Sequence, residues 1–105
     1  MKFLISIVLL FLFGMNSVFS QYSIKGQITD SQEQPLPYVN IVLYSITDLK
    51  NPKGTVSDEN GAFEFQKIVE GNYRIEISSL GFENQNIEEF ELKTNKILPI
   101  ILKEE

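Results

Sequence analysis

The chain has 105 residues and a formal net charge of −5, and it contains no histidine and no cysteine. An acidic chain without clustered Lys and Arg does not suit nucleic acid, because binding to phosphates needs such clusters. The missing histidine removes the usual general base, the usual zinc ligand and every Ser-His-Asp triad. Without disulfides, a hydrophobic core has to stabilise the fold alone.

Residues 1–20 have the pattern of a secretory signal peptide. Lys2 gives a positive start, Phe3 to Phe13 is an almost unbroken apolar run, and Val18-Phe19-Ser20 suits a cleavage site. The run is shorter than the ~20 apolar residues that span a bilayer, so we expect cleavage and no transmembrane segment afterwards. No cysteine follows the cleavage site, so no lipid anchor is expected. The mature domain, 21–105, is expected in the periplasm, the outer membrane or the medium.

After the signal, apolar and polar residues alternate with the period of two that is typical of β-strands. The first two predicted strands, 22–29 and 38–44, are separated by a proline-containing loop at 30–37. Their predicted buried faces are Tyr22, Ile24, Gly26 and Ile28 on the first strand, and Val39, Ile41 and Leu43 on the second. The second strand is half apolar on its other face too, so we expect it in the centre of a sheet.

The segment from Ile46 to Lys53 is predicted to be a long connection, because it contains Asp, Asn and Pro. Two short strands follow, Thr55–Ser57 and Ala62–Gln66. Between them lie Asp58, Asn60 and Gly61, residues that favour a tight turn. We therefore expect a β-hairpin here.

Three further strands are predicted at 73–78, 87–92 and 97–102. The apolar phase slips between Ile87 and Phe90, which predicts a bulge at Glu88-Glu89. Pro99 cannot donate to a ladder, so the last strand is expected at an edge or with a bulge. Seven short strands in about 80 residues indicate an all-β fold, a seven-stranded Greek-key β-sandwich in a single domain.

Five short motifs follow one another through the predicted mature chain. They are Gly26–Asp30; Pro35–Ile41, with Pro35, Leu36 and Pro37; Gly54–Phe63, with Gly54, Thr55, Asp58, Gly61 and Phe63; Gly71-Asn72-Tyr73; and Ser78–Phe82, with Gly81 and Phe82. In this order they resemble the carboxypeptidase-regulatory-like domain, a sandwich of transthyretin-like (prealbumin-like) topology. The resemblance covers essentially the whole mature chain.

The resemblance implies an accessory module with no catalytic residues and no cofactor of its own. In Bacteroidota such domains are common at the N-terminus of outer-membrane proteins, including TonB-dependent receptors. Those receptors continue into a plug and a barrel, whereas this sequence stops at Glu105. One hypothesis is therefore that the chain is a truncated N-terminal domain of such a receptor.

Three of the motif residues have a specific expected role. A side chain at Gly26 would crowd the opposing sheet or disturb the strand twist. Tyr73 can bury its ring while its hydroxyl reaches a loop carbonyl. Gly81 is expected to have a positive φ, so Gly81→Val should destabilise the fold.

Few residues suggest chemistry. Asp58 and Asn60 are weak candidates for a calcium site, because only part of a calcium loop is present and a turn explains these residues better. The carboxylates Glu88, Glu89 and Glu91 are predicted to be solvent-exposed. The four tyrosines, Tyr22, Tyr38, Tyr44 and Tyr73, could stack on sugars or simply pack. A carbohydrate- or calcium-binding module therefore stays an alternative.

The last strand is the best candidate for an interaction site. Ile97, Pro99 and Ile101 form one apolar face of a terminal strand, which is a natural docking surface unless the domain itself covers it. The sequence thus predicts a non-catalytic, exported module for protein–protein interaction in the cell envelope, associated with outer-membrane transport or receptor systems. It does not identify the partner.

Overall fold

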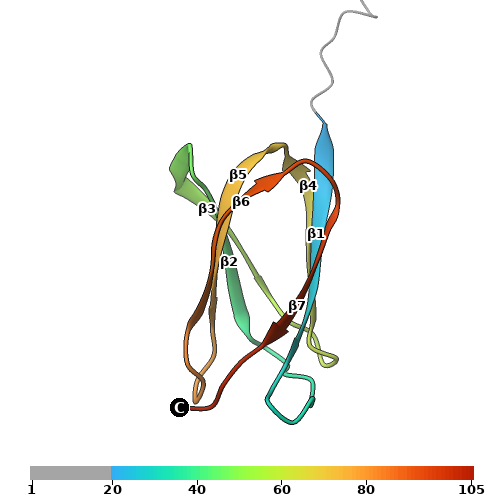
Figure 1. Cartoon of the computed structure of the whole chain (residues 1–105), viewed down its shortest axis with the longest axis vertical. Coiled ribbons are helices and arrows are strands. Elements are labelled where there is room, and N and C mark those ends of the chain that lie inside the picture. Colours follow the sequence, from blue (N-terminus) through green and yellow to red (C-terminus); the bar gives the residue numbers. More distant parts are fainter. Residues whose placement is uncertain (1–19) are drawn as a thin grey trace, which may run out of the picture.

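The computed structural model describes residues 20–105, which form seven strands in two sheets (Figure 1). The predicted signal peptide lies outside the described residues, apart from its last residue, Ser20. The strands are β1 (Gln21–Thr29), β2 (Asn40–Ser45), β3 (Asp48–Val56), β4 (Ala62–Val69), β5 (Gly71–Ser78), β6 (Gln85–Leu92) and β7 (Lys96–Ile101). The sheet orders are β4-β1-β7 and β3-β2-β5-β6. The predicted all-β, seven-stranded sandwich is confirmed.

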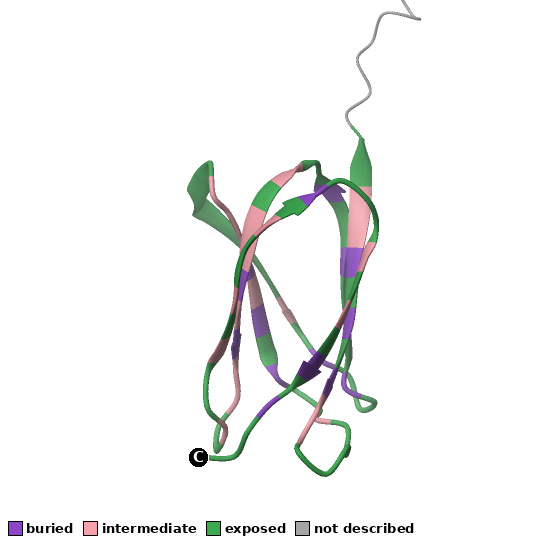
Figure 2. Cartoon of the chain, viewed as in Figure 1, coloured by how far each residue is buried: buried purple, intermediate pink, exposed green. Residues whose placement is uncertain are grey.

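One hydrophobic core lies between the two sheets (Figure 2). The alternation of the strands supplies it, because every second side chain of a strand points to the same face. Its buried members are Ile24, Ile28, Val39, Ile41, Leu43, Phe63, Phe65, Ile68, Ile75, Ile77, Leu92, Ile100 and Leu102. The buried faces expected for β1 and β2 are correct, and β2 lies between β3 and β5 as a central strand. None of these buried apolar side chains comes from β3.

The expected long connection between β2 and β3 is wrong, because pairing resumes after a turn of two residues. Ser45 pairs with Asp48 and Leu43 with Lys53, so residues 49–52 oppose a single β2 residue and bulge outward. This β3 lobe, Asp48–Lys53, projects from the sandwich in Figure 1. Pro52 is tolerated there because β3 is an edge strand, whose outer side has no ladder partner.

The expected hairpin between β3 and β4 is also wrong. β3 pairs with β2 and β4 pairs with β1, so residues 57–61 carry the chain from one sheet to the other. Ser57 explains the difference: its Oγ donates to the carbonyl of Leu36 (2.7 Å) and accepts from the N–H of Val39 (2.9 Å). These bonds keep the chain in the four-stranded sheet until the turn begins at Asp58.

Besides the β3 lobe, two further bulges shape edge strands, one on β6 and one on β4. Tyr73 pairs with Phe90 and Ile75 with Ile87, so Glu88-Glu89 opposes one residue of β5, and the predicted bulge is confirmed. A second bulge, which the alternation of β4 did not predict, lies at Gln66-Lys67, where Lys67 has a φ of 56°. A bulged residue of this kind often needs a left-handed backbone.

Gly26 accommodates a neighbour within its own sheet. A Cβ on Gly26 would lie 2.3 Å from the ring of Phe63, its pairing partner on β4, and 2.7 Å from the carbonyl oxygen of Leu98 on β7. We predicted crowding against the opposing sheet. In the structure, the crowding would come instead from the two adjacent strands of the same sheet. The aromatic ring packs across the strand over the space that glycine leaves.

Candidate functional site

The outward side of the three-stranded sheet is an ordered array of exposed side chains, which we call the three-strand face. Pairing sets them in rows across β4, β1 and β7: Glu64, Lys25 and Ile97; then Ala62, Gln27 and Pro99; then Thr29 and Ile101. β7 runs parallel to β1 and antiparallel pairing joins β1 to β4. Residues far apart in sequence thus share one surface.

The β7 column of this face is apolar and uncovered. Ile97 is 80% exposed and Ile101 is 58% exposed, and Pro99 between them is exposed as well. The alternate residue Ile100 is only 3% exposed and belongs to the core. Within the described chain, the strand therefore buries one apolar face and presents the other to solvent.

Pro99 also alters the open edge of β7. The N–H of Leu102 donates to the carbonyl of Thr29 on β1, at 2.9 Å. Along a strand of a parallel ladder, the backbone N–H and C=O groups of successive residues point alternately toward the partner strand and away from it. Since Leu102 bonds to β1, the backbone groups of Ile97, Pro99 and Ile101 point away from β1. Proline has no N–H, so the middle of this edge lacks a donor, which disfavours the addition of another strand. A partner that binds at β7 would therefore contact mainly the side chains of the three-strand face.

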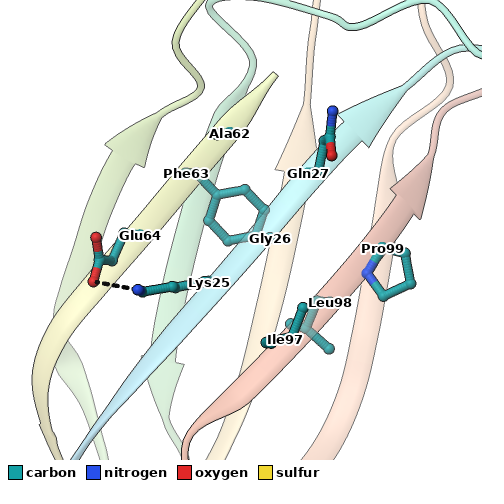
Figure 3. Close-up of a pocket in the computed structure, with 9 residues that line it drawn as sticks. All are labelled: Lys25, Gly26, Gln27, Ala62, Phe63, Glu64, Ile97, Leu98 and Pro99. Carbon is teal, nitrogen blue, oxygen red and sulfur yellow. Dashed lines mark ion pairs between the residues drawn. The ribbon is translucent and has the colours of Figure 1, made fainter. Parts of the chain in front are cut away.

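A shallow groove of about 460 Å³ lies across the face (Figure 3). In Figure 3 the Lys25 side chain leans toward Glu64, and the Nζ–Oε1 distance is 3.9 Å. Gln27 donates from Nε2 to the carbonyl of Asn60 at 3.3 Å. The short side chain of Ala62 and the ring of Pro99 leave the space between the rows open. The lining residues are Lys25, Gly26, Gln27, Ala62, Phe63, Glu64, Ile97, Leu98 and Pro99.

The charge of this sheet is opposite to that of the chain. The strands β1, β4 and β7 carry three lysines, at positions 25, 67 and 96, and one carboxylate, Glu64. Their net charge is therefore +2, in a chain whose net charge is −5. Most carboxylates lie on β6 and in the loops. On the three-strand face itself, the outward rows hold Lys25 and Glu64, whose charges balance, because Lys96 lies in the opposite phase with its Nζ 4.7 Å from the centroid of the Phe90 ring.

The candidate calcium ligands have a structural role. Oδ1 of Asp58 accepts hydrogen bonds from the backbone N–H groups of Asn60 and Ala62, both at 2.9 Å. The carboxylate thus closes the turn that leads into β4. Among residues 20–105, no group of three or more His, Cys, Asp or Glu side chains is arranged to hold a metal ion.

The tyrosines do not form one platform. Tyr22 and Tyr73 pack against the core, Tyr38 lies 68% exposed in a loop, and Tyr44 lies on the outer face of the four-stranded sheet. There the guanidinium of Arg74 stands 4.1 Å from the Tyr44 ring centroid. The Tyr73 hydroxyl donates to the carbonyl of Val69, the last residue of β4, and not to a loop carbonyl as predicted. Burial raises the pKa of this hydroxyl.

The three carboxylates of β6, Glu88, Glu89 and Glu91, are exposed as expected. The family-motif residues are spread over the fold, and only Gly26 and Phe63 line the groove. The others lie on β3 (Gly54, Thr55), on β5 (Gly71, Tyr73) and in the loops (Pro35, Leu36, Pro37, Asp58, Gly61, Gly81, Phe82). They build the scaffold, whereas Ile97, Pro99 and Ile101 are brought together on one surface.

A family model of the CarboxypepD_reg-like domain matches residues 24–105, which is every strand except the first three residues of β1. The chain belongs to this family. The family match confirms the resemblance to the carboxypeptidase-regulatory-like domain that the sequence motifs suggested. A comparison with the curated proteins finds no match in sequence, and no helix within residues 20–105 is long and apolar enough to cross a membrane.

Solved structures similar to this CarboxypepD_reg-like domain share its fold. The 3-chlorocatechol 1,2-dioxygenase of Rhodococcus opacus 1CP has a TM-score of 0.68 and 12% identity, over 87% of this chain and 62% of that chain. A type II cohesin–X-dockerin complex of Acetivibrio cellulolyticus has a TM-score of 0.62 and 18% identity, over 77% of this chain and 56% of that chain. The major pilin subunit BcpA of Bacillus cereus has a TM-score of 0.63 and 15% identity, over 81% of this chain and 29% of that chain.

These likenesses show a common β-sandwich architecture. The domain spans less than two thirds of the length of each of these structures. At such low identity, neither an activity nor a binding partner passes from them to this chain.

Proposed function

We propose that this CarboxypepD_reg-like domain is a non-catalytic, exported module that binds a protein partner in the cell envelope through its three-strand face. The observation that carries the proposal is the exposed apolar column of Ile97, Pro99 and Ile101 on the edge strand β7. Full burial of one isoleucine side chain contributes about 1.5–3 kcal/mol. Two exposed isoleucines on one small face are therefore a substantial source of binding free energy.

Two further observations support a binding role over a catalytic one. The sequence contains no histidine or cysteine, and the carboxylates that could serve as acid–base pairs are exposed. Among proteins of the same fold, one structure is a cohesin–dockerin complex and another is a pilin subunit, which are assembly proteins by name. The dioxygenases share the fold, but chemistry has to be argued from a site, and the described residues offer none.

The cellular context forms the finer part of the proposal. Residues 1–20 direct export, the mature module begins at Gln21, and it works in the periplasm or at the outer membrane, in association with a transport or receptor system such as a TonB-dependent receptor. The sequence pattern of the signal and the family resemblance support this context. A native product found in cytosolic fractions, with its N-terminus intact, would contradict it.

Photo-crosslinking in cells tests the binding role. A photoreactive amino acid replaces Ile97 in the native chain, and a matched control replaces Leu80, which is 100% exposed in the loop after β5. We expect one defined envelope protein, identified by mass spectrometry, to crosslink at position 97 and not at position 80. The absence of a product at 97, or the same products at both positions, would refute the use of this face.

A further inference from the structure

We propose that Gln21, the first residue of the mature domain, is a modification site whose α-amino nitrogen closes onto its own side-chain amide to give an N-terminal pyroglutamate. The inference rests on one part of the proposed function, the removal of residues 1–20, and adds the chemistry of the terminus that this cut creates. It follows from the residue type at position 21, the direction of its backbone nitrogen, and the place of β1 in its sheet.

The chemistry requires an N-terminal glutamine and no other group of the protein. The α-amino nitrogen attacks the side-chain amide carbon Cδ and forms a five-membered lactam. The bond from Cδ to Nε2 breaks, and the side-chain nitrogen leaves as ammonia with the proton that the α-amine gives up. An α-amino group is a weaker base than a lysine side chain, so part of it is in the unprotonated, attacking form near neutral pH.

The fold tolerates a cut before Gln21. The N–H of Glu70 donates to the carbonyl of Ser20 at 3.3 Å, which is longer than an ordinary backbone hydrogen bond. Tyr22 packs against the core, and Ile24 is fully buried, so both lie after the cut. The loss of Ser20 therefore removes a weak contact and leaves the core complete.

The backbone nitrogen of Gln21 points away from β4. Gln21 pairs with Val69, next to the hydrogen-bonded pair of Ser20 and Glu70. Hydrogen-bonded and non-hydrogen-bonded pairs alternate along an antiparallel ladder. Gln21 and Val69 are therefore a non-hydrogen-bonded pair, and the nitrogen of Gln21 does not donate to β4.

On the other side of β1, the ladder with β7 begins too late to include this nitrogen. The N–H of Ser23, which has the same direction, donates to Oδ1 of Asn95 at 2.9 Å. β7 begins at Lys96, which pairs with Ile24, so within residues 20–105 β7 has no residue opposite Gln21. The side chain of Gln21 is exposed and can turn toward its own nitrogen. Ring closure therefore breaks no hydrogen bond of either ladder.

The neighbour of the ring is apolar. The side chains of a non-hydrogen-bonded pair lie on one face of the sheet and close together. Val69 is 43% exposed, so it presents apolar surface to the residue at position 21. Ring closure removes the charge of the terminus, and a neutral lactam is a better neighbour for Val69 than an ammonium group, which has to stay hydrated.

The position of β1 gives the modification a protective role. β1 is the central strand of the sheet β4-β1-β7 and carries the buried residues Ile24 and Ile28 (Figure 1). Chain termini are preferred points of proteolytic attack, and an aminopeptidase needs a free α-amine. Stepwise trimming from Gln21 would soon reach Ile24 and open the core. A lactam has no free amine, so trimming stops before it begins.

Mass spectrometry of the native product tests the inference. The full chain is expressed with a C-terminal affinity tag in the cells that make it, and its N-terminal peptide is sequenced. We expect this peptide to begin at Gln21 and to be lighter than the unmodified peptide by one molecule of ammonia. An isotope-labelled synthetic peptide with a free N-terminal glutamine, added at lysis, should stay largely free and so measures cyclisation during preparation.

Gln21→Asn is the matched control. It keeps a side-chain amide but has one methylene fewer, so closure would need a strained four-membered ring and the terminus stays free. Because the side chain at position 21 is exposed, the variant should melt at the same temperature as the parent. A purified aminopeptidase should remove the first residues of the variant and leave the native product intact.

Three results would overturn the inference: a free amine at Gln21 in the native product, equal cyclisation of the native and the labelled peptide, or equal trimming of the native product and Gln21→Asn. None of them touches the proposed export or the three-strand face. A mature terminus at another residue would also overturn the inference while export stands. A product that retains residues 1–20 would overturn the proposed export together with it.

Discussion

Asp30 and Asp58 close two turns with the same hydrogen-bond pattern. In each turn Oδ1 of the aspartate accepts from the backbone N–H groups two and four residues later, and the aspartate N–H donates to the carbonyl four residues later. The residue three positions on has a positive φ in both cases, 63° at Glu33 and 77° at Gly61. One turn thus holds a glutamate in a backbone conformation that favours glycine.

We therefore expect Glu33→Gly to stabilise the domain. The left-handed region costs a non-glycine residue about 1–2 kcal/mol, while glycine adds roughly 0.5–1 kcal/mol of unfolded-state entropy, so a net gain of about 0.5–1 kcal/mol should remain. Urea denaturation of both proteins measures it. Ser31→Gly is the control, because Ser31 belongs to the same turn without a positive φ and should give no gain. An unchanged or lower stability for Glu33→Gly would show that the turn tolerates glutamate without strain.

The opposite change at the equivalent position should be severe. Gly61→Ala combines a φ of 77° with a Cβ that would lie 2.3 Å from the carbonyl oxygen of Ile28. Backbone strain of about 1–3 kcal/mol adds to the cost of displacing a buried strand, so we expect a loss of more than about 3 kcal/mol. Thermal unfolding followed by circular dichroism measures the loss. A variant that unfolds within 2 °C of the parent, on the order of measurement error, would contradict the geometry.

Local turn chemistry was predictable from sequence, but sheet membership was not. Asp58 and Gly61 indicate a turn because their side chains and backbone preferences act over a few residues. Whether the strands on either side pair with each other depends on Ser57, whose hydroxyl bonds to Leu36 and Val39 about twenty residues earlier in the chain. Nothing in the alternation of β3 and β4 records that contact, so the hairpin prediction failed. The positive φ of Glu33 was missed for a similar reason, because glutamate carries no signal for it.

Ser57 should be one of the most sensitive polar positions. It is 1% exposed, and its hydroxyl satisfies both the N–H of Val39 and the carbonyl of Leu36. Ser57→Ala leaves both groups buried without that partner, so we expect a loss of about 2–3 kcal/mol. Chemical denaturation gives the value, with Ser31→Ala at an exposed loop site as a control that should change little. A loss below about 0.5 kcal/mol would mean that water replaces the hydroxyl.

The candidate site was half predictable. The alternation of β7 and the presence of Pro99 marked Ile97, Pro99 and Ile101 as an interaction edge. Their neighbours Lys25 and Glu64 were not expected beside them, because the parallel pairing of β7 with β1 joins opposite ends of the chain. Such long-range register has no local signature. The charged pair Lys25 and Glu64 beside Ile97 was therefore not predictable from the alternation of any one strand.

The outer face of the four-stranded sheet offers a test by pH. The guanidinium of Arg74 donates to Oε1 of Glu76 at 2.6 Å, and this hydrogen bond holds the pKa of Glu76 below its ordinary value near 4.5, against a smaller effect of burial. A carboxyl whose pKa is lowered by folding stabilises the fold above its unfolded pKa, and this stability is lost as the pH falls through the folded pKa. Arg74→Met should therefore raise the pKa of Glu76 toward its ordinary value, as measured by NMR titration of the carboxyl carbon.

The stability difference between that variant and the parent should begin to shrink as the pH falls below about 4.5, where Glu76 becomes protonated in the variant. It should vanish once the pH has also fallen through the lowered pKa of Glu76 in the parent. Lys25→Met serves as the control. The contact of Lys25 with Glu64 is long and exposed, so this substitution should leave the titration of Glu76 unchanged. An identical Glu76 titration in parent and Arg74→Met would show that the ion pair does not persist in solution.

Gly81 separates backbone strain from steric overlap. Its φ is 87°, yet a Cβ placed there would meet no atom within 4 Å. Substitutions at this position should therefore rank by their tolerance of a left-handed backbone alone. We expect Gly81→Asn to be mild, since Asn visits this region readily, and Gly81→Val to cost about 1–3 kcal/mol, since a β-branched residue is an outlier there. Each kcal/mol should lower the melting temperature by about 4–8 °C. The N–H of Glu105 donates to the carbonyl of Gly81 at 3.1 Å, and the N–H of Glu83 donates to the carbonyl of Lys103 at 2.8 Å. If Gly81→Val melts at the same temperature as the parent, the loop relaxes to another conformation and these bonds do not hold it in place.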